Sequence, residues 1–206
     1  MKMNKSKKID IAERFGGKGI FPYQLAFTLL MPIRNIFLSP KKLIQRLEIK
    51  EDSIILEIGS GPGYFSIKIA ESISKGKLIL ADIQQEMLDY AKKRIDKKGL
   101  KNVEYYLCDG KTLQFPDNSF DRIFMVTVIG EVENKEEYMK EFYRILKNDG
   151  ILSISELAGD PDKMTIEDIK VLAENSGFKF YKIYGNKKNF TINFKKHNGT
   201  QHGKKQ

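Results

Sequence analysis

An apolar run that leads directly into three alternate glycines is the feature that most constrains the fold of this chain. The stretch reads ILEIGSGPGYF over residues 55–65. Glycine is costly in ordered structure, and it is favoured where the backbone turns sharply or approaches another group closely. In open parallel sheets, ligands bind beyond the carboxyl ends of the strands. The stretch therefore predicts a buried strand, a ligand-binding loop and then a helix.

Strand-like and helix-like segments alternate from Ser53 onwards. Apolar runs predict strands at residues 53–58, 77–82, 102–109, 120–129, 151–156, 178–185 and 190–196. Helical periodicity or helix-stop residues predict helices at residues 63–74, 84–99, 134–150 and 165–177. Such alternation predicts an α/β fold whose mostly parallel sheet is covered by helices on both faces.

Composition excludes several kinds of site. The 206 residues suit one domain of ordinary size. Cys108 is the single cysteine, so neither an internal disulfide nor a thiolate metal cluster can form, and a reducing compartment is expected. The two histidines, His197 and His202, lie in the last ten residues of the sequence. A histidine-based metal site or catalytic triad in the core is therefore excluded, and we predict no bound metal.

The net charge of +9 is unevenly distributed along the chain. Residues 1–50 carry 11 basic and 3 acidic side chains, residues 51–160 carry 15 and 20, and residues 161–206 carry 10 and 4. The basic ends can meet an anionic membrane surface or a nucleic acid, or they can be solvated arms without a partner. Because the middle is acidic, nucleic acid is the less favoured partner.

Polar residues at the ends of three successive predicted strands complete a candidate site. Glu57 lies two residues before the first glycine, and a carboxylate there needs hydrogen-bond donors or a cationic ligand. Asp82 ends the second strand, where an acid can accept hydrogen bonds from ribose hydroxyls or cap the next helix. Asp109, followed by Gly110, could accept a hydrogen bond from an adenine amino group. Together they predict a site for an adenosine with a positively charged, amino-acid-like tail.

These motifs resemble those of class I S-adenosylmethionine-dependent methyltransferases. LEIGSGPGYFS resembles the first motif of that family, ADIQQEML the second and CDGKTLQFPDNSFDRI the third, within residues 49–196. The resemblance implies a Rossmann-like, doubly wound, seven-stranded sheet with an antiparallel last strand and an N-terminal helical cap. It also implies S-adenosyl-L-methionine as the cofactor, bound by Tyr23, Glu57, Gly59, Ser60, Gly61, Gly63, Asp82, Ile83, Met87, Asp109, Gly110 and Val126.

The expected chemistry is an in-line displacement at an activated methyl group, in which alignment alone can supply ~7–11 kcal/mol. A general base is needed only when the acceptor is a poor nucleophile at neutral pH. Members of the resembled family often carry histidine after strand four, whereas this chain reads VTVIGEVEN there. Glu131 in that stretch is the candidate catalytic residue, or else a carboxylate at a helix N-terminus.

The predicted organisation is an N-terminal cap at residues 1–50, a methyltransferase domain at 51–196 and a basic, flexible tail at 197–206. Residues 21–47 hold more apolar side chains than one helix face needs. They predict a lid over a small, apolar or amphipathic acceptor, which can be a lipid-like, quinone-like, thiol or amine compound. The alternative is that these side chains simply pack on the core.

The same apolar segment, with Lys41 and Lys42, predicts peripheral contact with a membrane surface. Its longest apolar stretch is too short to span a membrane and contains Pro32, so a cytoplasmic protein is expected.

Three other functions stay open on the sequence. The basic termini could recruit RNA or protein as the methylated substrate, which a salt-dependent affinity for RNA would reveal. The chain could be a regulatory protein that binds the cofactor without turnover. It could also be a nicotinamide-dependent oxidoreductase, although the dinucleotide fingerprint needs glycine at its sixth position, where this chain has Tyr64.

Overall fold

The computed structural model describes residues 21–31 and 34–196. The first 20 residues of the predicted cap and the predicted tail at 197–206 lie outside the described residues. The strands are β1 (Ile54–Ile58), β2 (Lys77–Asp82), β3 (Val103–Leu107), β4 (Phe120–Val126), β5 (Leu146–Glu156), β6 (Phe178–Asn186) and β7 (Asn189–Lys196). The helices are η1 (Tyr23–Leu30), α2 (Arg34–Phe37), α3 (Pro40–Leu47), α4 (Ser66–Ser72), α5 (Gln85–Lys97), η2 (Ile129–Glu131), α6 (Lys135–Ile145) and α7 (Ile166–Asn175), with η marking 3₁₀ helices.

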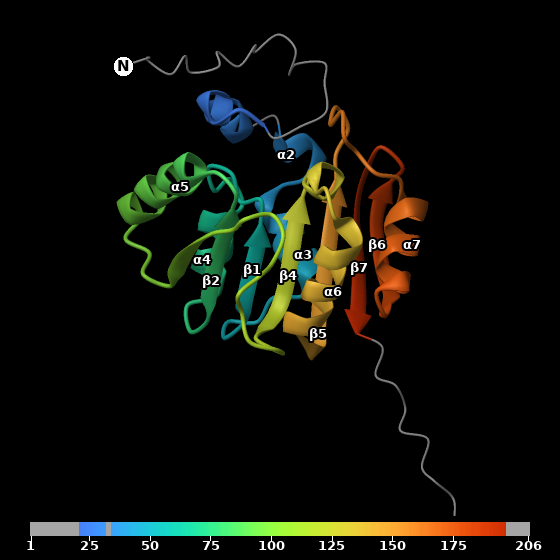
Figure 1. Cartoon of the computed structure of the whole chain (residues 1–206). Helices are drawn as coiled ribbons and strands as arrows, with labels where there is room; N and C mark the ends of the chain where they lie inside the picture. Colours follow the sequence, from blue (N-terminus) through green and yellow to red (C-terminus); the bar gives the residue numbers. More distant parts are fainter. Residues whose placement is uncertain (1–20, 32–33, 197–206) are drawn as a thin grey trace, which may run out of the picture.

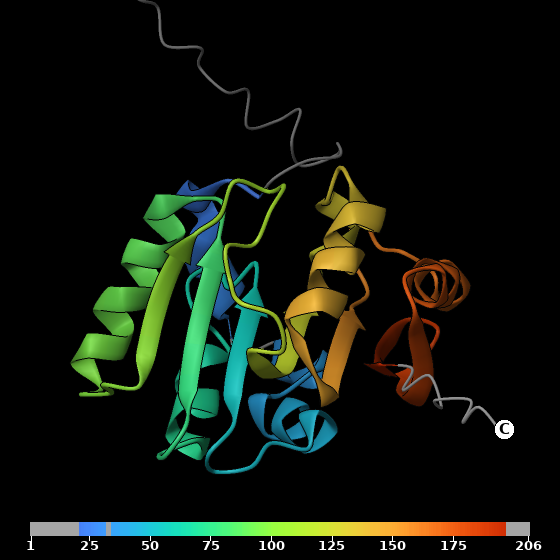
Figure 2. The same ribbon diagram turned by 60° about the horizontal axis from the view of Figure 1, so that its bottom comes forward.

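The described strands form one sheet in the order β3-β2-β1-β4-β5-β7-β6. β1 runs parallel to β2 and β4, whereas β7 is antiparallel to both of its neighbours, β5 and β6. Figure 2 shows β3 and the red β6–β7 pair at opposite ends of the sheet. The predicted Rossmann-like sheet with an antiparallel last strand is therefore confirmed.

Each face of the sheet carries its own hydrophobic core, because successive strand residues point to opposite faces. On one face, α6 and α7 pack against residues that include Leu56 and Phe194. On the other face, α3, α4 and α5 pack against residues that include Ile55 and Phe124. The central strands are thus buried on both faces, as is usual for parallel sheets.

Helix α3 belongs to the body of the fold, although it falls within the segment predicted to be a cap. Leu43 and Leu47 are fully buried in the second core. The guanidinium group of Arg122 donates hydrogen bonds to the carbonyls of Leu47 and Glu48, at 2.5 and 2.7 Å, and so satisfies the end of the helix. By contrast, η1 and α2 lie above the ends of the central strands (Figure 1).

Two element boundaries differ from the sequence-based expectation. The helix predicted to run to residue 150 ends at Ile145, because Leu146 adopts an extended conformation and pairs with Phe120 in the sheet. The fourth strand ends at Val126 rather than at Ile129, and a short 3₁₀ helix, η2, follows it. At Leu146 sheet pairing overrides the helical periodicity of the local sequence, whereas pairing of β4 with β5 stops at Val126.

Candidate functional site

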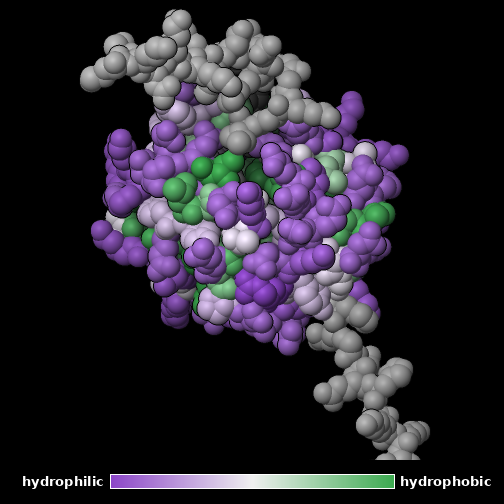
Figure 3. Space-filling view, viewed as in Figure 1, coloured by the Kyte–Doolittle hydropathy of each residue, from purple (hydrophilic) through white to green (hydrophobic). Residues whose placement is uncertain are grey.

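A cavity of about 980 Å³ lies beyond the carboxyl ends of the central strands. Its walls include the loop after β1, the end of β2, the segment after β4, and the residues that follow β5. Phe21, Leu25, Leu29 and Phe37 close it from the side of η1 and α2. Figure 3 shows apolar side chains beside a hollow at this end of the molecule. The volume is at the upper end of the range usual for small-molecule sites.

The glycine loop forms one wall, and its conformation explains the residue type at two positions. Gly59 and Gly61 have φ of +64° and +52°, in the left-handed region that other residues rarely adopt. A Cβ on Gly59 would lie 2.4 Å from a methyl carbon of Val128. A Cβ on Gly61 would meet only a methyl carbon of Leu29, at 3.6 Å. At Gly61 the backbone therefore faces open space in the cavity.

Gly63 serves packing instead, since it does not line the cavity. A Cβ there would lie 3.2 Å from the Cβ of Ala91 on α5. Arg94, from the same helix, donates hydrogen bonds to the carbonyls of Pro62 and Gly63, at 2.6 and 2.9 Å. Sequence reasoning missed Arg94 because nothing local distinguishes it from the other basic residues of this amphipathic helix.

Asp82 connects the end of β2 to the glycine loop. Its side chain is only 7% exposed, and its two oxygens accept hydrogen bonds from the backbone amides of Gly61, at 2.8 Å, and Gln84, at 3.0 Å. Burial raises the pKa of Asp82, and these amides act in the opposite direction. An ionised carboxylate offers about four acceptor positions, so two stay available to a ligand.

Glu57 lies deeper, at 3% exposure, and accepts a hydrogen bond of 2.6 Å from the hydroxyl of Ser66. The pKa of Glu57 is raised to about 8, because the effects of burial and of the charge of Asp82 outweigh the lowering effect of the Ser66 hydroxyl. Among the described residues its donor is thus a side-chain hydroxyl at the start of α4, not a loop amide. The Ser60 hydroxyl, in the glycine loop, is buried and has no hydrogen-bond partner among the described residues.

Asp109 follows the end of β3 and is exposed at the rim of the cavity. Its carboxylate accepts hydrogen bonds from the backbone amides of Lys111 and Thr112, at 2.8 and 2.9 Å, and these bonds lower its pKa. Gly110 has φ of +73°, and a Cβ there would have one neighbour, a methyl carbon of Ile83 at 3.8 Å.

Most of the predicted cofactor residues line this one cavity. They are Glu57, Gly59, Ser60, Gly61, Asp82, Ile83, Met87, Asp109, Gly110 and Val126. Tyr23 is not among the lining residues, and its side chain is 41% exposed. The N-terminal segment reaches the cavity through other apolar residues, and the Gln84 amide group donates a hydrogen bond of 2.8 Å to the carbonyl of Phe21.

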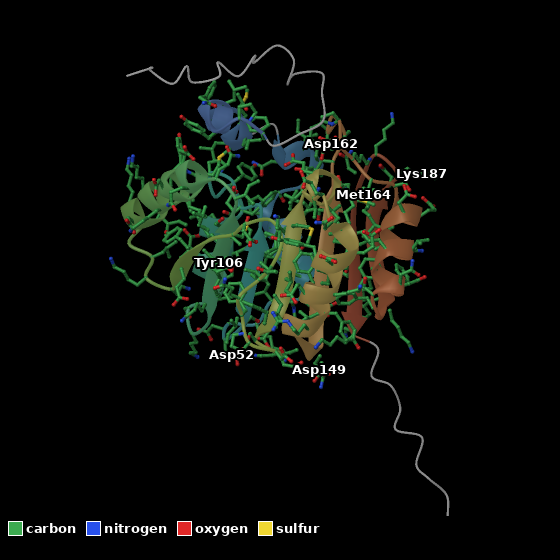
Figure 4. The ribbon with its side chains drawn as sticks, viewed as in Figure 1. Asp52, Tyr106, Asp149, Asp162, Met164 and Lys187 are labelled. Carbon is green, nitrogen blue, oxygen red and sulfur yellow. The ribbon has the colours of Figure 1, made fainter. Side chains whose placement is uncertain are left out.

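The far end of the cavity, beyond β4 and β5, is lined by acidic residues. Glu131, on η2, faces this end together with Asp160 and Asp162. A Cβ on Gly130 would lie 1.8 Å from the carbonyl oxygen of Asp162, so η2 and the loop after β5 are in direct backbone contact. Figure 4 shows Asp162 at the end of the molecule opposite to Asp52 and Asp149.

The carboxyl groups at this end of the cavity raise one another's pKa values. Burial, together with the charges of Asp160, Asp162 and Asp82, raises the pKa of Glu131 to about 7. Burial likewise raises the pKa of Glu156 to about 8, with Asp160 as the next cause. Sequence reasoning identified Glu131 but missed Glu156 and Asp160, because their proximity depends on sheet pairing and loop packing.

Two further residues at this end were not predicted to belong to the site. Tyr138, on the inner face of α6, lines the cavity, and burial raises the pKa of its hydroxyl. Thr127, directly after β4, has φ of +56°. This backbone conformation is strained for a β-branched residue, and strain of this kind often occurs at functional sites.

The residues of the cavity fit a nucleoside-containing ligand such as S-adenosylmethionine. The Ser60 hydroxyl is an unused polar group, and the backbone at Gly61 is open to a close contact.

No group of three or more metal-ligating side chains within residues 21–31 and 34–196 could hold a metal ion. No helix of the described chain combines the length and apolarity that crossing a membrane requires.

The sheet order and the glycine loop define a Rossmann-like α/β protein whose cavity lies at the switch point between β1 and β4. A family model described as a methyltransferase domain matches residues 49–196. The chain therefore belongs to this family, and it is a class I S-adenosylmethionine-dependent methyltransferase. Membership implies S-adenosyl-L-methionine as the methyl donor.

Curated relatives are similar over part of their length. The ubiquinone/menaquinone biosynthesis C-methyltransferase UbiE of Hydrogenovibrio crunogenus is 30% identical over 112 residues, which are 53% of this chain and 44% of that protein. UbiE of Francisella tularensis subsp. novicida is 31% identical over 120 residues, which are 57% of this chain and 48% of that protein. The matches thus span about half the length of these relatives.

Solved structures share the fold. A SAM-dependent methyltransferase from Aquifex aeolicus superposes with a TM-score of 0.80 at 24% identity, covering 85% of this chain and 98% of that one. A TehB-like SAM-dependent methyltransferase from Corynebacterium glutamicum gives a TM-score of 0.67 at 17% identity, covering 85% and 100%.

Proposed function

We propose that the chain transfers a methyl group from S-adenosylmethionine to a small, apolar or amphipathic acceptor by in-line displacement. One observation carries this proposal: a single cavity is lined by the glycine loop, by apolar side chains of η1 and α2, and by Glu131. Donor and acceptor would then meet in one enclosed space, where alignment and exclusion of water lower the barrier. The UbiE relatives, whose names specify a quinone pathway, favour a small-molecule acceptor.

In this proposal five of the predicted cofactor residues have a stated role. Asp82 accepts hydrogen bonds from the ribose hydroxyls with the acceptor positions that the two backbone amides leave available. Ile83 and Met87 flank the adenine, and Asp109 accepts a hydrogen bond from its amino group. Glu57 balances the positive charge of the donor. The bound donor supplies an activated methyl group, and the chain holds and shields it.

The lid favours an apolar acceptor and contact with a membrane surface. Its inner side chains close the cavity, while Phe27, Met31 and Ile36 are 60%, 50% and 72% exposed on the outside. Exposed apolar residues of this size are typical of segments that enter the headgroup region of a bilayer. An acceptor with a lipid-like part could then pass from the membrane into the cavity beneath η1.

Replacing Gly61 by alanine is expected to weaken cofactor binding at least tenfold, because the new methyl group would occupy the space beside the loop backbone. The matched control is Gly99→Ala, since Gly99 also has a left-handed φ of +71° but has no atom within 4 Å of its added Cβ. Both variants should lose roughly 1–2 kcal/mol of stability from backbone strain. Calorimetric titration with S-adenosylmethionine would measure the difference. Equal affinities in the two variants would contradict the proposed cofactor position.

The acceptor class can be identified with methyl-labelled S-adenosylmethionine. The protein is incubated with the label and an extract of the cells that make it, and lipid, small aqueous, RNA and protein fractions are then separated. We expect label in the lipid or small aqueous fraction, with Gly61→Ala as the inactive control. Label in RNA or protein would instead favour recruitment by the basic termini. No label despite tight cofactor binding would favour a regulatory protein.

A further inference from the structure

The positive charge of the protein is concentrated in two segments of the sequence. The first comprises helix α3 and the three residues after it, residues 40–50, and the second is the β6–β7 hairpin, residues 178–196. Together they carry ten basic side chains and one acidic side chain, Glu48. The difference equals the net charge of the whole chain, +9, so the rest of the sequence carries no net charge. Charge that is concentrated in this way attracts an anionic partner.

Hydrogen bonds place the two segments side by side on one face of the sheet. The guanidinium group of Arg46, on α3, donates a hydrogen bond of 2.8 Å to the hydroxyl of Thr191 on β7. The side-chain amide of Asn193, on the same strand, donates one of 2.6 Å to the carbonyl of Arg46. Lys42 is exposed and precedes Arg46 by one helical turn, so it lies on the side of α3 that borders the hairpin. The two segments therefore form one continuous basic surface.

Like charges lie next to each other within the hairpin. Lys179 on β6 is directly opposite Lys195 on β7, so their side chains share one face of the sheet. Like charges at such a position destabilise a sheet. Lys182 is also on this face, because it is opposite Asn193. Glu48, the one carboxylate of the two segments, pairs with Lys182 at 2.7 Å, and thus most of their positive charge is not compensated by an acid of their own.

Two tyrosine rings lie among these cations. The ammonium groups of Lys195 and Lys182 are 4.0 and 4.7 Å from the centre of the Tyr181 ring. The guanidinium carbon of Arg46 is 5.5 Å from the centre of the Tyr184 ring. Such contacts restrict the long basic side chains, so they lose less conformational freedom when an anion binds. Both rings are partly exposed, and the surface therefore offers aromatic area together with held positive charge.

This combination favours a partner that has both phosphates and unpaired bases. Open sheet faces with basic and aromatic side chains are typical of proteins that bind single-stranded nucleic acid, because the cations contact phosphates and the rings stack on bases. A membrane fits less well. The exposed apolar residues of η1 and α2 lie beyond the ends of the strands (Figure 1), whereas the basic surface runs along one face of the sheet. A bilayer that receives the former would not lie against the latter.

We propose that the surface formed by α3 and the β6–β7 hairpin binds single-stranded RNA. Lys42, Lys179 and Lys195 contact phosphates, and Tyr181 and Tyr184 stack on bases. RNA is the partner rather than DNA because unpaired bases are far more common in RNA. This binding goes beyond the proposed methyl transfer and does not make RNA the methyl acceptor. The cavity is lined by several carboxylates, which oppose the entry of a phosphate, so the RNA lies outside it.

The full-length protein is titrated into a fluorescein-labelled oligouridylate of about 12 nucleotides, and fluorescence anisotropy reports binding. The test variant combines Lys42→Gln, Lys179→Gln and Lys195→Gln. We expect it to bind at least tenfold more weakly than the wild type. The loss of three phosphate contacts should also lower the slope of log affinity against log salt by about 2. Its thermal stability should not fall, because two of the replaced lysines repel each other.

The matched control combines Lys93→Gln, Lys97→Gln and Lys101→Gln, which remove the same charge from exposed positions on and after α5. Its affinity for the oligouridylate should stay within about twofold of the wild type. An equal loss in the two triple variants would mean that net charge or another part of the chain binds the RNA, and it would overturn the assignment. Absence of binding by the wild type would overturn it as well.

A further variant tests whether bases are stacked. Tyr184→Ala should weaken the oligouridylate at least fivefold, since stacking on one base contributes roughly 1–3 kcal/mol. Tyr184→Phe keeps the ring and should bind as the wild type does. Inorganic polyphosphate of similar length, which has no bases, should bind equally to all three proteins. An equal loss of polyphosphate and RNA affinity in Tyr184→Ala would overturn the stacking role.

Two other anionic partners are compared directly with RNA. Oligothymidylate of the same length and phosphatidylglycerol vesicles are titrated against the wild type and the triple lysine variant. Tighter binding of the wild type to the DNA, or a larger loss of vesicle binding than of RNA binding in the variant, would overturn the choice of RNA. The affinity of the variant for S-adenosylmethionine should equal that of the wild type. Failure of the RNA proposal would therefore leave the proposed methyl transfer unaffected.

Discussion

Replacing Asp82 by asparagine is expected to weaken the binding of S-adenosylmethionine about 100-fold. In the proposed site this carboxylate accepts hydrogen bonds from the ribose hydroxyls, and each bond to a charged group contributes ~1.5–3 kcal/mol. The amide of asparagine retains one oxygen, and the amides of Gly61 and Gln84 already compete for the oxygens of this side chain. Calorimetric titration of wild type and variant measures the effect.

The control for this prediction is Asp89→Asn, which removes a carboxylate from the exposed face of α5. Its affinity for the cofactor should equal that of the wild type. Thermal melting shows whether the Asp82 variant is folded at the temperature of the titration. An unchanged affinity in a folded Asp82→Asn protein would show that the ribose does not bind at this carboxylate.

The ligand-free protein is expected to become less stable as the pH rises from 6 to 8.5. Glu57, Glu131 and Glu156 have pKa values raised to about 8, 7 and 8 in the fold, from an ordinary value of 4.5. Between these values the folded state binds more protons than the unfolded state, so the free energy of unfolding falls with rising pH. One pKa unit corresponds to about 1.4 kcal/mol, so Glu156 alone would remove about 2–3 kcal/mol across this range.

Urea denaturation at pH 6 and pH 8.5 checks this prediction. Glu156→Gln keeps the shape of the side chain without its charge, so its stability should fall less with pH and should exceed that of the wild type at pH 8.5. Glu174→Gln is the matched control, because Glu174 is an exposed residue of α7. The same pH dependence in wild type and Glu156→Gln would show that Glu156 is ionised, and balanced, at neutral pH.

The fold was predictable from local pattern, since each strand and most helices are marked by their own periodicity. The end of the cavity that the glycine loop lines was predictable for a similar reason. Its residues occupy short motifs at strand ends, and the carboxyl ends of parallel strands meet at one edge of the sheet. Glu57, Asp82 and Asp109 lie around one cavity as that rule requires.

The far end of the cavity, beyond β4 and β5, was much less predictable. Asp160 and Glu156 reach Glu131 only because β5 pairs with β4 and the loop after β5 crosses over η2. Arg94 likewise acts on the loop across a distance in sequence that no local pattern encodes. The end of α6 was missed because pairing of Leu146 with Phe120 outweighs its helical periodicity.

The position of β7 between β5 and β6 has a consequence for the growing chain on the ribosome. β1 to β4, which carry the glycine loop and Asp82, can pair before the other half of the sheet is made. β5 must then wait for its outer neighbour until β7 has been synthesised and has left the exit tunnel. At about 5–20 residues per second this wait lasts roughly a few seconds. During that interval the open edge of β5 can pair with another nascent chain, so slowed translation between β5 and β7 should favour aggregation.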